Sequence, residues 1–128
     1  CLYGELGSGK TVFAKGLAEG LGIKQDKVVS PSFVLIREYH KARLPLYHFD
    51  LYRLKSPGDI VALGYEEYFF SDGLCVIEWP DRLGNLLPAE FIKVKIEVRG
   101  KNKRLISIDT RGDSYKELSG RISEIIRN

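Results

Sequence analysis

Residues 4–11 read Gly4-Glu5-Leu6-Gly7-Ser8-Gly9-Lys10-Thr11, which fits the pattern of glycine, four residues, glycine, lysine, and serine or threonine. This pattern is typical of a phosphate-binding loop. Its three glycines allow the backbone to curl until successive N–H groups point at an anion, and the positive end of a following helix adds to the attraction. Apolar residues precede the loop, and apolar residues at helical spacing follow it, as a strand, loop and helix would require. The sequence therefore predicts a polyphosphate site built from residues 4–12.

Two side chains of the loop have expected roles in that site. Lys10 would reach the β- and γ-phosphates as a positive charge, and the hydroxyl of Thr11 would bind the Mg²⁺ that travels with them. Val12 directly follows and completes the stretch expected around the nucleotide. ATP and Mg²⁺ are accordingly the expected cofactors.

The size and composition of the chain predict one ordinary globular domain. The chain has 128 residues, of which 29% are charged and 44% hydrophobic, enough for a single core. Only three residues precede the loop, fewer than the roughly five of a typical strand, so we expect that an N-terminal segment is missing. No apolar run approaches the roughly 20 residues that span a bilayer, and we expect a cytoplasmic protein. Cys1 and Cys75 lie in apolar runs and are expected to be buried, reduced thiols.

The apolar patterning predicts an α/β fold with a mostly parallel sheet, appended antiparallel strands and flanking helices. The continuous apolar run at 74–77 is typical of a strand buried on both faces of a parallel sheet. The amphipathic C-terminal helix is expected to cover a sheet face. The expected helices span about 10–21, 57–63, 65–70 and 115–126, and the expected strands span 32–39, 46–52, 74–77, 91–98 and 104–109, with hairpins joining the first two and the last two strands.

Two carboxylates are candidates for the chemistry beside the phosphates. Alternation along the strand at 46–52 places Tyr47, Phe49 and Leu51 on a core face, and His48 and Asp50 on the other face. We expect Asp50 to lie near the metal-bound phosphates and His48 to be a hydrogen-bonded structural residue.

The second carboxylate, Glu78, directly follows the buried strand at 74–77. It therefore falls at the carboxyl edge of the sheet, where open α/β sheets bind ligands. There it could complete a Mg²⁺ shell or orient an attacking water. For the neighbouring Trp79, stacking on the nucleotide and simple packing are equally good interpretations.

A basic stretch follows these motifs. Between positions 91 and 111 it holds seven basic residues and two acids, Glu97 and Asp109. Contact with a nucleic acid such as RNA, or with an acidic partner, is one interpretation, and a solvated strand face is the other. The basic residues are Lys93, Lys95, Arg99, Lys101, Lys103, Arg104 and Arg111.

The motifs together resemble the bacterial TsaE family, the ATPase component of tRNA threonylcarbamoyladenosine biosynthesis, and the resemblance runs over nearly the whole chain. The block at 48–53 and the Glu-Trp pair at 78–79 make it far more specific than a phosphate loop alone. The segments that carry it are the loop at 4–11, Ser30-Pro31-Ser32-Phe33, His48-Phe49-Asp50-Leu51-Tyr52-Arg53 and Val76-Ile77-Glu78-Trp79-Pro80.

The resemblance implies a P-loop ATPase that hydrolyses ATP slowly alone and acts with TsaD and TsaB proteins, which transfer threonylcarbamoyl to an adenosine beside the tRNA anticodon. It implies that Thr11 and Glu78 hold Mg²⁺, that Lys10 holds the phosphates and that Asp50 is needed for hydrolysis. The segment 30–33 would act as a switch near the γ-phosphate, and Trp79 would lie close to the nucleotide.

Some positions depart from the family pattern. Ser8 replaces the commoner alanine and Val12 the commoner second threonine, and both leave Lys10 and Thr11 in place. Ser32 stands where threonine is usual and keeps the hydroxyl. The family's N-terminal segment, which helps to enclose the base, is expected to be missing here, and a base contact from the region of Arg104 is a hypothesis.

Three alternative functions fit the sequence less well. A small-molecule kinase would need a lid with clustered arginines, whereas the middle of this chain predicts a hairpin. A GTPase switch would carry Asn-Lys-x-Asp late in the domain, and Asn102-Lys103-Arg104-Leu105 lacks the acid. A non-catalytic RNA-binding module would depend on the basic stretch and lose RNA at raised salt.

Overall fold

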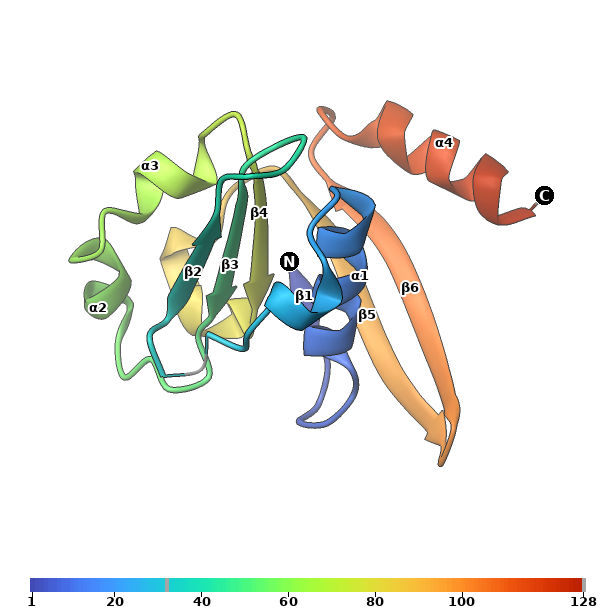
Figure 1. Ribbon diagram of the computed structural model, residues 1–128, viewed down its shortest axis with the longest axis horizontal. Coiled ribbons are helices and arrows are strands. Elements are labelled where there is room, and N and C mark those ends of the chain that lie inside the picture. The colour runs from blue at the N-terminus through green and yellow to red at the C-terminus, as the bar shows by residue number, and fades with distance from the viewer. Residues whose placement is uncertain (32, 128) are drawn as a thin grey trace.

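The computed structural model describes residues 1–31 and 33–127, and these form one mixed α/β layer structure (Figure 1). The described residues build a six-stranded sheet of order β2-β3-β4-β1-β5-β6. Strands β3, β4, β1 and β5 run parallel, while β2 and β6 pair antiparallel at the two edges. The elements are β1 Leu2–Tyr3, α1 Lys10–Gly20, the 3₁₀ helix η1 Gln25–Lys27, β2 Ile36–Tyr39, β3 Leu46–Asp50, α2 Pro57–Val61, α3 Tyr65–Phe69, β4 Leu74–Glu78, the 3₁₀ helix η2 Pro80–Leu86, β5 Phe91–Gly100, β6 Lys103–Arg111 and α4 Lys116–Arg127.

The sheet separates two apolar clusters because successive strand residues point to opposite faces. On one face, Leu46 of β3 and Val76 of β4 pack in a cluster with Ala14 and Ala18 of α1. On the other face, Phe49 and the side chains of α2, α3 and η2 form the second cluster. The central strands are thus covered on both sides, as their apolar runs predicted.

The expected mostly parallel sheet with antiparallel additions is confirmed, and both hairpins form. The strand expected at 32–39 is shorter in the structure, because β2 begins at Ile36. Leu35 has a positive φ of 66°, and the N–H groups of Val34 and Leu35 donate to the carbonyl of Pro31 at 3.0 and 2.8 Å. This turn prevents a strand from starting at position 32. Ser32 itself lies outside the described residues.

The C-terminal helix differs from expectation. Helix α4 contacts β6 and borders a small cavity of about 220 Å³ with Ile106 and Ile108, but it extends away from the end of β6 (Figure 1). Ile125 and Ile126 remain 73% and 71% exposed. The prediction that α4 covers a sheet face is therefore wrong for much of its apolar stripe.

The remaining expectations concern the cysteines and the membrane. Cys1 and Cys75 are free thiols and half-buried. Burial raises the pKa of the Cys75 thiol to about 12. Among the residues that the structure describes, none of the helices has the length and apolar character needed to cross a bilayer.

Candidate nucleotide site

The loop between β1 and α1 is closely packed at Gly4. A Cβ atom at Gly4 would lie 2.5 Å from Ser8 Oγ and 2.7 Å from the carbonyl oxygen of Ile96, so only glycine fits there. Gly9 has φ 112° and immediately precedes α1, a conformation that side chains other than hydrogen disfavour. The N–H of Ser8 donates to the Glu5 carbonyl at 3.0 Å. The loop therefore leads directly into the N-terminal end of α1, where anions are stabilised.

Lys10 is folded back along this loop. Its Nζ donates to the carbonyls of Gly4 and Glu5 at 2.7 and 2.8 Å and lies 4.1 Å from the centroid of the Trp79 ring. Burial lowers the pKa of Lys10, and the negative charges of Glu78, Asp50 and Asp81 oppose that shift. The ammonium group is thus held at the cavity beside the loop by two backbone carbonyls and the Trp79 ring.

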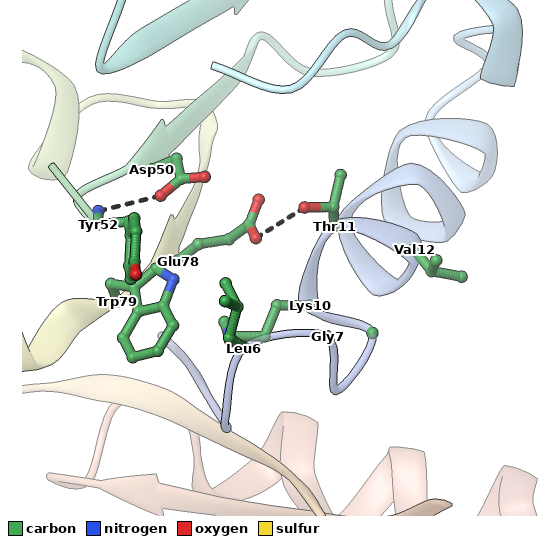
Figure 2. A pocket seen from close by; sticks show the side chains of 10 residues that line it. Leu6, Gly7, Lys10, Thr11, Val12, Asp50, Tyr52, Glu78 and Trp79 are labelled. Carbon is green, nitrogen blue, oxygen red and sulfur yellow. Dashed lines mark hydrogen bonds between the residues drawn. The ribbon is translucent and has the colours of Figure 1, made fainter. Parts of the chain in front are cut away.

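Thr11, Glu78 and His48 form a hydrogen-bonded chain across three elements. Thr11 Oγ1, from the first turn of α1, donates to Glu78 Oε1 at 2.8 Å, the contact drawn in Figure 2. On the other side, His48 Nε2 lies 2.6 Å from Glu78 Oε2. Glu78 at the end of β4 is 2% exposed and His48 of β3 is 1% exposed. The expectation that His48 is a hydrogen-bonded residue is confirmed, and its partner is the candidate metal ligand.

Asp50 lies beside Glu78 at the same edge of the sheet. The two residues are direct register partners at the ends of the parallel strands β3 and β4. Asp50 is buried, and its Oδ1 accepts a hydrogen bond from the N–H of Tyr52 at 3.0 Å. Figure 2 shows both carboxylates on the side of the cavity that faces Thr11. The sheet therefore brings together the two acids that the sequence analysis selected.

These side chains surround a cavity of about 320 Å³, a size suited to a small-molecule ligand. Most of the expected site residues border it. Tyr52 also borders the cavity, and the centroid of its ring lies 5.1 Å from that of Trp79. The sequence analysis did not select Tyr52. Its place in the block at 48–53 was the signal that could have identified it. The lining residues are Leu6, Gly7, Gly9, Lys10, Thr11, Val12, Asp50, Tyr52, Glu78 and Trp79.

Other expected site residues are not among those that line the cavity. Gly4, Glu5 and Ser8 shape the loop but do not line the cavity. Arg104 Nε donates to the carbonyl of Ser8 at 2.9 Å, so Arg104 braces the outside of the loop. A base contact from Arg104 stays a prediction.

The donor set fits a magnesium ion that is held jointly with phosphate. Within residues 1–31 and 33–127, no group of three or more His, Cys, Asp or Glu side chains is arranged to hold a metal. Mg²⁺ usually takes one or two protein oxygens and completes its shell with water and substrate phosphates. Thr11 Oγ1 and Glu78 Oε1, 2.8 Å apart beside the loop, supply such a pair of hard oxygen atoms. Thr11 and Glu78 would hold the ion, with Asp50 close by.

A glycine-rich loop between a sheet strand and a helix, with acids at the ends of neighbouring parallel strands, defines a P-loop nucleotide-binding fold. The sequence profile described as "Threonylcarbamoyl adenosine biosynthesis protein TsaE" matches residues 1–106. This chain belongs to the TsaE family.

Individual relatives agree with that assignment. The chain is 42% identical over 122 residues to the tRNA threonylcarbamoyladenosine biosynthesis protein TsaE of Bacillus subtilis, covering 95% of this chain and 75% of the relative. It is 44% identical over 107 residues to the protein of that name in Treponema pallidum, covering 84% and 78%. The crystal structure of Bacillus subtilis YdiB superposes with a TM-score of 0.79 at 40% identity, covering 96% of this chain and 74% of that one.

Proposed function

We propose that this chain is a Mg²⁺-dependent ATP-binding and ATP-hydrolysing subunit of tRNA threonylcarbamoyladenosine biosynthesis that acts with TsaD and TsaB proteins. The observation that carries the proposal is the convergence of the loop, the Thr11–Glu78 pair and Asp50 on one cavity. The biosynthetic process is the one named for the family and for the relatives.

Each side chain then has a role in phosphoryl transfer, which depends mainly on positioning and on charge neutralisation. Backbone N–H groups of the loop and the start of α1 would bind the polyphosphate, and Lys10 would exchange its carbonyl partners for the β- and γ-phosphates. Magnesium, when bound, supplies charge neutralisation on the phosphate oxygens. Asp50, placed beside Glu78 in the strand register, would orient the attacking water.

The cavity also indicates why turnover alone would be weak. No arginine is among the described residues that line it, although an arginine commonly stabilises the transition state in related NTPases. Arg53 is the nearest candidate by sequence, and its guanidinium lies 4.2 Å from the centroid of the Phe33 ring. We therefore propose that a partner protein completes the site or orders it.

The proposal is tested by measuring ATP hydrolysis and tRNA threonylcarbamoylation together. The reaction contains the chain, TsaD and TsaB proteins and tRNA, each omitted in turn, with Mg²⁺ or with EDTA. We expect slow Mg²⁺-dependent hydrolysis by the chain alone, faster hydrolysis with its partners, and modification only when the chain is present. Comparing ATP with GTP in the same assay distinguishes a GTPase switch. Modified tRNA formed equally well without the chain would refute the proposal.

A further inference from the structure

His48 is buried on β3, and its imidazole contacts the carboxylate of Glu78, the candidate metal ligand. We propose that His48 is a positioning residue that fixes the Glu78 carboxylate so that Oε1 faces Thr11. This inference builds on the proposed function, in which Thr11 and Glu78 hold Mg²⁺.

The strand register creates this contact. His48 is the register partner of Val76, as Asp50 is of Glu78, so the imidazole lies two residues along from the pair of acids and on the same face of the sheet. The side chains of His48 and Glu78 are only 1% and 3% exposed. His48 Nε2 lies 2.6 Å from Glu78 Oε2. A hydrogen bond that is shielded from water in this way holds both side chains more strongly than an exposed one would.

The two oxygens of Glu78 have different partners. A carboxylate only accepts hydrogen bonds, so the proton in the contact belongs to His48 Nε2, which donates to Oε2. Oε1 accepts from Thr11. This division prevents the carboxylate from rotating and keeps Oε1 at the cavity. Residues beneath a metal ligand commonly orient it in this way.

Packing alone does not explain an imidazole at this position. His48 Nδ1 is buried and has no hydrogen-bond partner among the described residues, which is unfavourable for a polar atom. An apolar ring of similar size would avoid that cost. The polar contact that His48 makes in the described part of the chain goes to Glu78, so the value of the imidazole lies in holding that carboxylate.

The first test measures ATP binding with and without Mg²⁺ through the fluorescence of Trp79, which is the only tryptophan of the chain and borders the cavity. A glutamine amide nitrogen reaches about as far as Nε2, whereas asparagine falls short. We expect His48→Phe and His48→Asn to weaken the Mg²⁺-dependent part of ATP binding by about 10- to 100-fold, the usual effect of losing such a support. His48→Gln should restore most of it, and binding in EDTA should change little in all three variants.

The matched control is the other histidine of the chain. His40 also lies beside a glutamate, Glu38, at 3.2 Å, but both side chains are well exposed, so His40→Phe should bind Mg²⁺ and ATP as the parent does. The effect should also depend on Glu78. In a Glu78→Gln background, adding His48→Phe should cause little further loss of Mg²⁺-dependent binding.

Several outcomes would overturn the positioning role. Equal Mg²⁺-dependent ATP binding by the parent and by His48→Asn would overturn it. The role would also be overturned if His48→Gln lost as much of this binding as His48→Asn while both variants melted as folded proteins. If His48→Phe does not fold, the pair of amide variants decides. A parent that binds ATP identically with and without Mg²⁺ would instead refute the proposed metal site, and the positioning role with it.

A second readout needs neither metal nor nucleotide. The chain has two histidines, so a tag-free His40→Gln protein retains His48 alone, and its ring ¹⁵N spectrum reports where the proton resides. We expect a protonated Nε2 that loses its hydrogen-bonded signature in Glu78→Ala. A proton on Nδ1 with a bare Nε2 would contradict the contact on which the inference depends.

Discussion

Replacing Glu78 in two ways separates its structural role from its chemical role. Glu78→Gln keeps the shape of the side chain and two hydrogen-bonding ends. Its oxygen can accept from His48 Nε2, while its amide donates to the Thr11 hydroxyl, which accepts as well as donates. Glu78→Ala removes the acceptor of both hydrogen bonds and leaves the His48 donor buried without a partner.

The magnitudes follow from these contacts. In Glu78→Gln, two hydrogen bonds lose their charge-assisted character, but a neutral group is buried in place of a carboxylate. The net loss in the free energy of unfolding should be about 1 kcal/mol. An unsatisfied buried donor costs about 1–3 kcal/mol, and the half-buried Thr11 hydroxyl adds less, so Glu78→Ala should cost about 2–4 kcal/mol. For a domain of this size, each kcal/mol lowers Tm by about 4 °C.

The assay combines urea unfolding, thermal melting and ATP hydrolysis. Both variants should lose hydrolysis, but Glu78→Gln should melt within about 4 °C of the parent, and Glu78→Ala about 8–16 °C lower. Glu124 on α4 is exposed, and the same two substitutions there should change neither property. Equal stability of Glu78→Ala and Glu78→Gln would refute the hydrogen-bonded chain, and parental hydrolysis by Glu78→Gln would remove Glu78 from the chemistry.

Three further outcomes are expected. Lys10→Ala should abolish nucleotide binding as measured by Trp79 fluorescence, whereas Lys15→Ala on the same helix should not; binding retained by the former would contradict the role of Lys10. Ser8→Ala should raise Tm by about 4 °C, since Ser8 Oγ is buried without a partner among the described residues and removing it gains about 1 kcal/mol; a lower Tm would show an unseen contact. Because the pKa of the Cys75 thiol rises from 9.0 to about 12 on folding, only the unfolded chain releases this proton between those values. As the pH rises above 9, the free energy of unfolding of the parent should therefore fall relative to that of Cys75→Val, as measured by urea unfolding. A difference between the two proteins that does not depend on pH would contradict the burial of this thiol.

The loop and its acids were predictable because their signals are local. The glycine pattern at 4–11 is typical of one backbone shape, and Glu78 follows an apolar run typical of a buried strand. That strands β3 and β4 are adjacent, however, is a property of the sheet. The contact between His48 and Glu78 depends on that pairing, which joins residues 30 positions apart.

Other differences have equally physical causes. The positive φ of Leu35 shortens β2, and no turn residue such as glycine marks the position in the sequence. The periodicity of α4 shows that one face of the helix is apolar but does not show what covers it. Tyr52 was missed although alternation along the expected strand at 46–52 places it on the face of His48 and Asp50, because a tyrosine on that face is not specific to a ligand site.

The most direct measurement is a crystal structure of this chain with Mg²⁺ and a non-hydrolysable ATP analogue. The triphosphate should lie in the loop at 4–11 with Lys10 Nζ on its outer phosphates. The ion should contact Thr11 Oγ1 and lie beside Glu78, whose other oxygen still meets His48. An analogue bound elsewhere, or an ion held away from Thr11 and both acids, would contradict the proposed site.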